Sequence, residues 1–337
     1  MLNKIYDKFK KFIKKNKIQL IVFFLTIFLF TYKLPFYIDI PGGLINTDKR
    51  VSIKESYDTK GSFNMTYVTE IHATPITYLA SLILDDWDII KEEELTYDSM
   101  SVEDIYNYQK LLLKETCNNA IINAYNKANK EVSTKEEELL VGLVFKEAET
   151  NLKIADKIIS IDGVKINNSV DLRNYLNTKN ENDKINISVL RKKKELKIEA
   201  TLKKSDDRVV IGIGIIDSKV IDTNPKVKLS FDDNESGPSG GLMTALTIYN
   251  DLIKEDLTDG DIISGTGTIE LDGTVGEISG VKYKILGAVK KKAKVFLVPS
   301  GDNYNEAMKI KKERKLDIEV VSIKTFDDAI EYLRNRK

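Results

Sequence analysis

A short glycine-rich turn in the C-terminal half of the chain constrains the fold most. Residues 236–241 read Ser-Gly-Pro-Ser-Gly-Gly, and apolar residues then recur at three- and four-residue steps, at Leu242, Ala245, Leu246, Tyr249 and Ile253. This spacing predicts an amphipathic helix that begins directly after the turn. Because a helix N-terminus presents unpaired backbone N–H groups, Ser239 is expected where a developing oxyanion could be stabilised.

A hydroxyl nucleophile needs a base, and the composition leaves few choices. The chain has one histidine, His72, and one cysteine, Cys117, and no histidine-containing motif surrounds His72. Nothing in the sequence therefore supports a Ser-His-Asp triad or a Cys–His pair. A lysine base remains, provided that burial lowers its pKa from about 10.4 toward about 7–8. The same scarcity of His and Cys argues against a metal site, and no cofactor is expected.

A second segment, residues 262–284, carries Thr-Gly-Thr-Ile-Glu-Leu-Asp-Gly and then Ser-Gly-Val-Lys-Tyr-Lys. Its local pattern predicts a strand, a hairpin turn at Asp272-Gly273, a second strand and a helix. With the Gly-Pro-Ser turn, this order resembles the proteolytic domain of Lon-type serine proteases.

The resemblance implies roles for individual residues. Ser239 corresponds to the nucleophile, Lys284 to the general base, and Thr266 to a hydroxyl near the lysine. The turn formed by Gly237, Pro238 and Gly240 would supply the backbone N–H groups of an oxyanion hole, excluding the proline itself.

The residues by themselves do not choose between two lysines. Lys282 lies nearer the middle of the apolar arc of the predicted helix, whereas the family spacing favours Lys284. Two positions depart from the family pattern, since Ser279 stands where glycine is common and Gly240 where alanine is common. The turn alone would also suit an ordinary helix N-cap; the ordered Thr266 and Lys284 elements favour the protease.

No nucleotide-binding motif accompanies this site. The chain lacks the Gly-x-x-x-x-Gly-Lys-Ser/Thr loop of the ATPase module that Lon proteases carry. The pair Gly212 and Gly214 lies in an apolar run, residues 209–216, that is predicted to be one buried strand. We therefore expect neither ATP dependence nor a bound dinucleotide.

The first 34 residues have the pattern of a membrane anchor. Residues 1–17 hold seven lysines and one aspartate, and an almost continuous apolar run reaches Tyr32. Fifteen apolar residues are fewer than the roughly 20 that are needed to cross a bilayer. The expected span, residues 18–34, is long enough only if the residues up to Ile38 are also counted. The bulky residues that follow do not suit a cleaved signal peptide, which is the alternative. The positive-inside rule then places residues 1–17 in the cytoplasm, and the catalytic domain outside the cell membrane.

Residues 131–204 resemble a PDZ domain. The run from Leu152 to Gly163 matches the hallmark Leu-x-x-Gly-Asp-x-Ile-x-x-Ile-Asp-Gly, with Ala155 where glycine is usual. PDZ domains bind an extended peptide at a sheet edge. The glycine-rich loop that grips a peptide carboxylate is missing before the predicted strand 140–145, so peptide docking and a purely structural spacer both stay open.

Residues 35–130 are predicted to form strands at 37–43 and 61–68 and a helix over 105–128. The whole order resembles the membrane-anchored Lon-like proteases of Gram-positive bacteria, some of which process secreted pheromone peptides. The predicted fold class is α+β, with a single N-terminal transmembrane helix, a PDZ-like β-rich module and a Lon-type α/β proteolytic domain over 205–337. Residues 35–130 are expected to contribute to that domain, which would make the PDZ module an insertion.

The predicted function is that of an ATP-independent serine endopeptidase. Its partners would be the lipid bilayer and a peptide or protein substrate, with a secreted signalling peptide among the candidates. The alternative is a non-catalytic scaffold that presents peptides through the PDZ module. The 52 acidic and 52 basic residues, without a basic stripe, argue against nucleic acid. The sequence does not fix an oligomeric state.

Overall fold

The structure is a computed structural model that describes residues 2–95 and 100–336. The chain divides into two compact units, Met1–Pro41 with Val68–Leu95, and Gly42–Tyr67 with Thr96–Lys337. Two long strands, β1 (Phe36–Asn46) and β3 (Ser62–His72), begin in one unit and end in the other. They are the strands predicted near 37–43 and 61–68, although Pro41-Gly42 makes no turn and β1 continues through it.

The first unit is small and mostly helical. It holds α1 (Leu2–Lys15), α2 (Lys17–Thr31), α3 (Pro75–Ser81), β4 (Asp88–Lys91) and α4 (Glu92–Leu95). Strand β4 pairs antiparallel with the first residues of β1, from Phe36 opposite Lys91 to Asp39 opposite Asp88.

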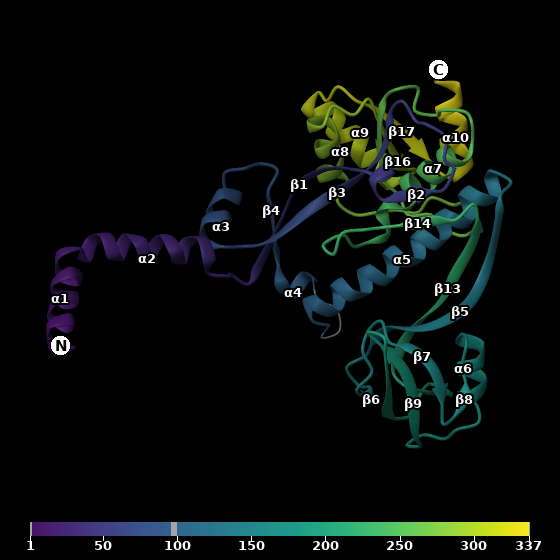
Figure 1. Ribbon diagram of the computed structural model, residues 1–337, viewed down its shortest axis with the longest axis horizontal. Coiled ribbons are helices and arrows are strands. Elements are labelled where there is room, and N and C mark those ends of the chain that lie inside the picture. The colour runs from purple at the N-terminus through teal and green to yellow at the C-terminus, as the bar shows by residue number, and fades with distance from the viewer. Residues whose placement is uncertain (1, 96–99, 337) are drawn as a thin grey trace. The chain divides into compact units, whose positions relative to one another are not determined.

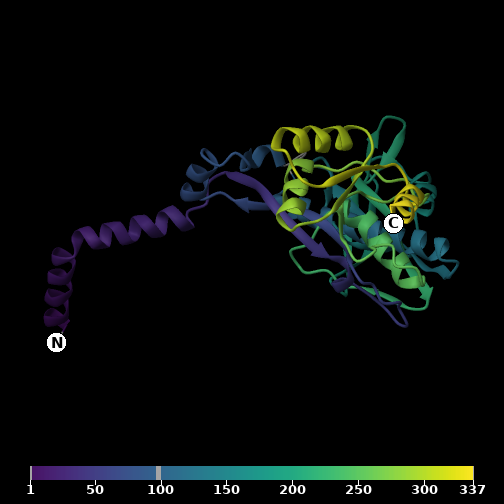
Figure 2. The same cartoon turned by 90° about the horizontal axis from the view of Figure 1, so that it is seen from above.

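The transmembrane helix predicted over residues 18–34 is wrong. Helix α2 has 15 residues and ends at Thr31, because Tyr32 is extended and residues from Phe36 onward form β1. At about 1.5 Å per residue α2 spans only about 22 Å, against a hydrocarbon core of about 30 Å. Asn16 separates α2 from α1, and Figures 1 and 2 show two distinct helices. Across residues 2–95 and 100–336, no helix is both long and apolar enough to cross a membrane.

Three predictions rested on that span and are corrected with it. They are the transmembrane part of the fold class, the lipid bilayer as a partner, and the single-pass topology with a cytoplasmic N-terminus and an extracellular catalytic domain. Hydropathy counted the apolar residues correctly in this region, but it could not show that the residues between Tyr32 and Ile38, which the span needed for its length, are not helical.

The second unit contains a sheet covered by helices on both faces. Its strands follow the order β17 (Glu319–Ile323), β16 (Val295–Pro299), β15 (Ile262–Gly265), β3 and β1. The pairs β17–β16, β16–β15 and β15–β3 are parallel. Strand β3 therefore pairs directly with β15, although about 200 residues separate them in the chain.

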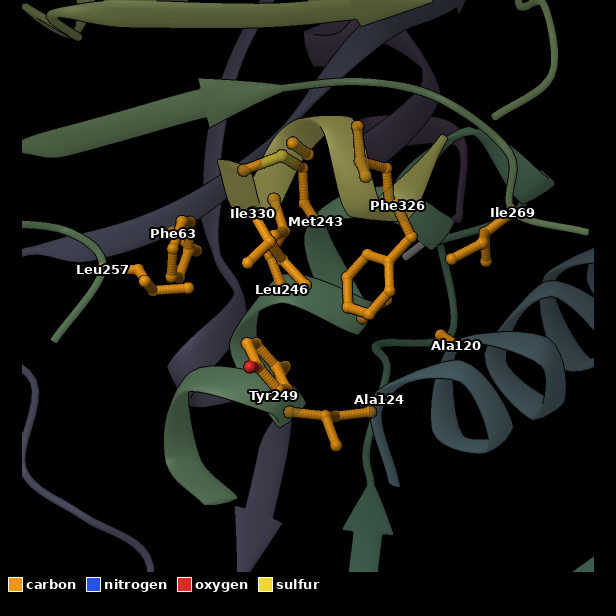
Figure 3. Close-up of a cluster of buried hydrophobic side chains, with 14 of the residues drawn as sticks. Phe63, Ala120, Ala124, Met243, Leu246, Tyr249, Leu257, Ile269, Phe326 and Ile330 are labelled. Atoms are coloured by element: carbon orange, nitrogen blue, oxygen red, sulfur yellow. The ribbon is translucent and has the colours of Figure 1, made fainter. Parts of the chain in front are cut away.

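Alternation along β16 shows how the two faces are filled. Val295 and Leu297 pack into the larger core with α5 (Val102–Lys127), α7 (Gly241–Leu252) and α10 (Phe326–Asn335). Phe296 and Val298 point to the opposite core, under α8 (Val281–Lys290) and α9 (Asp302–Arg314). This is the two-residue period of a strand buried on both sides. Figure 3 shows part of the larger core. The rings of Tyr249 and Phe326 lie edge to face there, with their centroids 6.0 Å apart.

The predicted β-rich module is present and has its own core. The strands follow the order β13 (Ile213–Asn224), β5 (Glu131–Val144), β7 (Lys157–Ile161), β9 (Lys184–Arg191), β10 (Lys194–Thr201) and β6 (Glu149–Thr150). Helix α6 (Ser169–Leu176) packs on it, and β8 (Val164–Lys165) pairs with β7. Figure 1 shows β5 and β13 as one long ribbon that ends in this module.

Local details of the module explain its sequence. Asp162 and Gly163, at φ 48° and 82°, form the predicted turn between β7 and β8. Ala155, which stands where the PDZ pattern has glycine, also has a positive φ of 70°. Buried Asp156 is held by Arg191, whose guanidinium lies 2.6 Å from it. The sequence does not reveal this ion pair, because Arg191 adjoins three lysines in one charged run.

Two predicted strands are wrong in detail. The run 209–216 is interrupted at Gly212, which has φ 83° and separates β12 (Arg208–Val210) from β13. After β15 no second strand of a hairpin follows; residues near Asp272-Gly273 form a looser turn, in which the Glu270 amide donates to the Thr274 carbonyl. The remaining short elements are η1 (Thr47–Lys49), η2 (Pro238–Gly240), β2 (Val51–Ile53) paired with β14 (Val227–Leu229), and β11 (Lys203–Ser205) paired with β12.

Candidate active site

Ser239 lies in a tight turn directly before the buried helix α7. Gly237 has φ 90°, residues Pro238–Gly240 form the 3₁₀ turn η2, and α7 begins at Gly241. The positive φ explains the glycine at 237, since a side chain is strained in that conformation. Helix α7 is apolar on nearly every side and almost wholly buried, so it gives the turn a rigid base.

Hydrogen bonds restrict which amides of the turn could face an oxyanion. The Gly237 amide donates to the Gln109 carbonyl of α5 at 3.1 Å, and the Gly241 amide donates to the Pro238 carbonyl. Proline has no N–H. The amides of Ser239 and Gly240 are then the candidates within this turn.

The segment after β15 holds the Ser239 backbone in place. The Ser239 carbonyl accepts from the Gly267 amide at 2.8 Å and from the Thr266 hydroxyl at 3.1 Å. In return, the Leu242 amide donates to the Gly267 carbonyl at 3.1 Å. The Thr266 side chain is fully buried, so its hydroxyl is fixed by these contacts.

Lys284 reaches the same threonine from α8. Its ammonium nitrogen Nζ donates to Thr266 Oγ1 at 3.2 Å, and the residue is only 3% exposed. Burial lowers the pKa of Lys284 to about 7, because water no longer stabilises the charged form. Thr266 thus links the lysine to the backbone of Ser239, and the lysine is partly uncharged near neutral pH.

Lys282, the other lysine that the sequence left open, is placed differently. It is half-buried, and its Nζ lies 5.4 Å from the centre of the Tyr283 ring. Gly280 at the start of α8 has φ 72°, so the helix begins only at Val281. Lys282 and Lys284 both lie in this helix, and Lys284 is the one that meets Thr266.

Neighbouring side chains fit closely around the glycines of the turn. A Cβ atom at Gly240 would lie 2.8 Å from Met65 Sδ, the far end of a flexible side chain. A Cβ at Gly241 would lie 2.3 Å from Thr116 Oγ1 and 3.0 Å from the backbone nitrogen of Ile269. The second glycine is therefore required more strictly than the first.

The contacts of the single histidine and the single cysteine do not include Ser239, Thr266 or Lys284. His72 Nε2 lies 2.7 Å from the Leu34 carbonyl, and its ring stacks on Tyr37. Cys117 is buried in α5, and burial raises the pKa of its thiol to about 12, so it is not a thiolate at neutral pH. Within the described ranges, no three His, Cys, Asp or Glu side chains gather as a metal-binding group.

Helix α5 contributes residues that the sequence did not single out. Gln109 accepts from Gly237, Thr116 packs against Gly241, and Asn119 donates to the Ile269 carbonyl at 3.0 Å. The predicted helix over 105–128 is confirmed as α5, with a capping box at Ser101 and Asp104. Its role beside the serine turn had no sequence signal, because 125 residues separate Thr116 from Gly241.

The C-terminal part of the chain matches a known family. Residues 233–335, which contain Ser239, Thr266 and Lys284, match the Lon protease (S16) C-terminal proteolytic domain. The Lon protease of Campylobacter jejuni subsp. jejuni serotype O:2 is 31% identical over 98 residues, which cover 29% of this chain and 12% of that protein. The Lon protease of Campylobacter concisus is 32% identical over 100 residues, covering 28% and 12% respectively. The chain thus spans only a small part of these relatives.

The middle of the chain matches a second family. Residues 132–202 match the PDZ domain. The solved PDZ domain of an SdrC-like protein from Listeria monocytogenes is 21% identical, with a TM-score of 0.22, covering 26% of this chain and 93% of that one. Along the chain, the match to the PDZ domain is followed by the match to the proteolytic domain of Lon protease.

Proposed function

We propose that this protein is a serine endopeptidase that uses Ser239 and Lys284 as a dyad and needs no ATP. The observation that supports the dyad best is the buried Lys284, whose Nζ donates to Thr266 Oγ1 while Thr266 donates to the Ser239 carbonyl. A lysine with a pKa near 7 can act as a base, whereas an exposed lysine cannot at neutral pH. The match of residues 233–335 to the Lon proteolytic domain supports the same assignment.

The proposed reaction proceeds in two halves. Ser239 Oγ attacks the carbonyl carbon of the scissile peptide bond while neutral Lys284 Nζ takes the hydroxyl proton. The amides of Ser239 and Gly240 stabilise the oxyanion, and Lys284 gives its proton to the departing amine. Water then attacks the acyl-enzyme, with Lys284 again accepting and returning the proton. Thr266 orients the lysine, and Gly237 and Pro238 shape the turn.

Two substitutions and one matched control test the dyad. We expect Ser239→Ala and Lys284→Ala each to lower peptide cleavage by at least about 10⁴-fold while the protein stays folded, because removing either member disables both. Lys282→Ala, two positions from Lys284 on the same helix, should cleave at the rate of the unsubstituted protein. Full activity in Lys284→Ala would exclude the proposed base. An inactive parent protein that still binds peptides would favour the scaffold alternative.

The independence from ATP is supported by the sequence of this chain, which has no phosphate-binding Gly-x-x-x-x-Gly-Lys-Ser/Thr loop. Cleavage of an unstructured peptide should proceed at the same rate with and without ATP and Mg²⁺. Stimulation by ATP would contradict this part of the proposal. The substrate class that we propose is peptides and protein segments in an extended form; a signalling peptide stays a prediction.

A further inference from the structure

Arg50 lies at the end of a turn that is anchored to the helix behind Ser239. It follows η1, and its amide donates to the Thr47 carbonyl at 2.9 Å. Thr47 is fully buried; its hydroxyl donates to the Phe63 carbonyl at 2.8 Å and is in hydrogen-bond contact with the Thr247 hydroxyl of α7. The backbone of Arg50 therefore has a fixed position relative to α7, whose N-terminus follows Ser239.

The Arg50 guanidinium holds the segment that leads into the serine turn. Its Nε and Nη2 donate to one carboxylate oxygen of Glu235, at 3.1 and 2.6 Å, and Nη2 also donates to Asp232. The other Glu235 carboxylate oxygen accepts from the Asp232 amide at 3.1 Å, and the Glu235 amide donates to the Asp232 carbonyl at 3.0 Å. The Arg50 carbonyl accepts from the Ser230 amide at 2.8 Å. Both ends of the segment 230–235 are thus bound to one arginine.

The two carboxylates that Arg50 contacts differ in their exposure to water. The side chains of Arg50 and Glu235 are 19% and 13% exposed, whereas that of Asp232 is 64% exposed. A shielded ion pair is weakened less by dissolved salt, and two N–H donors on one carboxylate fix its orientation as well as its position. Glu235 is therefore the main partner of Arg50.

Helix α5 holds the same part of the chain from another direction. The Tyr106 hydroxyl donates to the Asp233 carbonyl, and the Gln109 carbonyl accepts from the Gly237 amide at 3.1 Å. The residues before Ser239 are thus held by two elements that are far apart in the sequence, η1 with Arg50 and α5.

The serine turn depends on these contacts because a glycine connects it to the segment 230–235. Glu235 precedes Ser239 by four residues, and Gly237 lies between them at φ 90°. Since glycine adopts many backbone conformations at little cost, Gly237 does not by itself keep the turn in one shape. The proposed oxyanion donors are the amides of Ser239 and Gly240, and such donors are effective only when they are fixed before the reaction.

We propose that Arg50 is a positioning residue for the proposed reaction. Through Glu235 it fixes the segment 230–235, and with it the amides of Ser239 and Gly240 that stabilise the oxyanion. Arg50 takes no part in a bond-making step itself. This inference rests on the proposed endopeptidase function and adds a residue outside the dyad on which its rate depends.

The first test replaces the guanidinium and keeps the bulk of the side chain. In Arg50→Met, kcat for a short unstructured peptide should fall at least about 10-fold while KM changes less than about 2-fold, because oxyanion donors stabilise the transition state more than the bound substrate. Arg50→Lys keeps the charge but not the fork of donors, and should recover part of kcat. Arg334→Met is the matched control: Arg334 donates to Glu255 and Tyr249, not to residues 230–241, and its kcat should equal that of the parent.

Two further measurements separate positioning from a general loss of stability. Glu235→Gln should also lower kcat, and the double variant with Arg50→Met should be no slower than the slower single variant, because both changes remove one contact. The pH profile of Arg50→Met should keep the midpoint of the parent with a lower plateau, since Lys284 keeps its surroundings. A parental kcat in Arg50→Met, or independent effects of the two substitutions, would overturn the inference. If Arg50→Met does not fold, Arg50→Lys and Glu235→Gln decide by the same criteria.

Hydrogen exchange keeps this inference separate from the proposed function. If the parent cleaves nothing, the proposed function fails, and the role of Arg50 is then measured on the inactive parent. Amides in residues 230–241 should exchange at least about 10-fold faster in Arg50→Met than in the parent, and at the parental rate in Arg334→Met. This result supports the inference that Arg50 fixes the segment, and exchange that Arg50→Met leaves unchanged overturns it.

Discussion

The protonation state of Lys284 decides when the proposed dyad can work. Because burial lowers its pKa to about 7, the fraction of neutral lysine rises steeply between pH 6 and 8. Protonated Lys284 cannot accept the serine proton, so kcat/KM should rise about tenfold per pH unit below pH 7 and level off above it. Steady-state cleavage of a peptide without ionisable side chains, measured from pH 5.5 to 9, would show this profile.

The midpoint alone does not distinguish this lysine from a histidine, since an ordinary histidine also titrates near pH 6.5. His72→Ala provides the control: His72 contacts the Leu34 carbonyl and Tyr37, and none of the proposed catalytic groups. The pH profile should be the same in this variant. Loss of the pH-dependent rise in His72→Ala would mean that the base has been misassigned.

The same burial of Lys284 lowers the free energy of unfolding of the protein. Its pKa is about 7 in the folded protein and about 10.4 in an unfolded chain, so between these values the unfolded state binds more protons and the stability of the fold rises with pH. Lys284→Met keeps a similar shape without the charge, and Thr266 can still donate to the Ser239 carbonyl. At pH 7 we expect Lys284→Met to unfold at a higher urea concentration than the parent.

The advantage of Lys284→Met should be largest at pH 7 and below, and should shrink toward pH 10 by up to about 1.4 kcal/mol per pH unit. Urea unfolding at pH 7, 8 and 9 measures it. A constant difference across this range would show that Lys284 is not buried as a neutral base.

At the scale of elements, α5 and the serine turn fit together through two adjacent glycines with different tolerance. Gly240→Ala meets only the flexible end of Met65, so activity and stability should change little. Gly241→Ala meets Thr116 Oγ1 and the Ile269 backbone, and we expect a loss of about 1–3 kcal/mol in the free energy of unfolding together with slower cleavage. Thermal unfolding and peptide cleavage of both variants, made side by side, provide the comparison. Equal effects at the two positions would contradict the packing described here.

The sequence could predict features that depend on residues close together in the chain, but not those that depend on distant ones. The Ser239 turn, α7 and the Asp162-Gly163 turn follow from short patterns, because the residues that determine them are adjacent in the chain. The pairing of β3 with β15, and of Gln109 with Gly237, depends on contacts across long separations that no local pattern encodes. The predicted membrane anchor was wrong for a third reason: the apolar residues are present, but the helix ends at Thr31 and the residues up to Ile38 that the span required do not extend it.

At the scale of the whole molecule, the PDZ module and the protease domain have separate hydrophobic cores, joined through the β5–β13 ribbon. Residues Glu131–Val144 and Ile213–Asn224 pair along this ribbon, and Thr134 lies opposite Ile221. We propose that the module is an insertion in the protease domain and holds protein substrates for cleavage. Separate cores mean that the module can be removed without opening the protease core.

Replacing residues 135–220 with Asn-Gly tests this, because a two-residue turn then joins Thr134 to Ile221 and keeps the base of the ribbon paired. The shortened protein should cleave a short unstructured peptide at nearly the parent rate, since Ser239, Thr266 and Lys284 keep their surroundings. For a protein substrate, kcat/KM should fall at least about 10-fold, because docking at a second site raises the effective concentration of the scissile segment. Lys114→Ala, which breaks the ion pair to Glu138 but keeps the module, controls for the contact between α5 and the ribbon. Equal losses on peptide and protein would mean that the ribbon supports the protease fold and that the module does not select substrates.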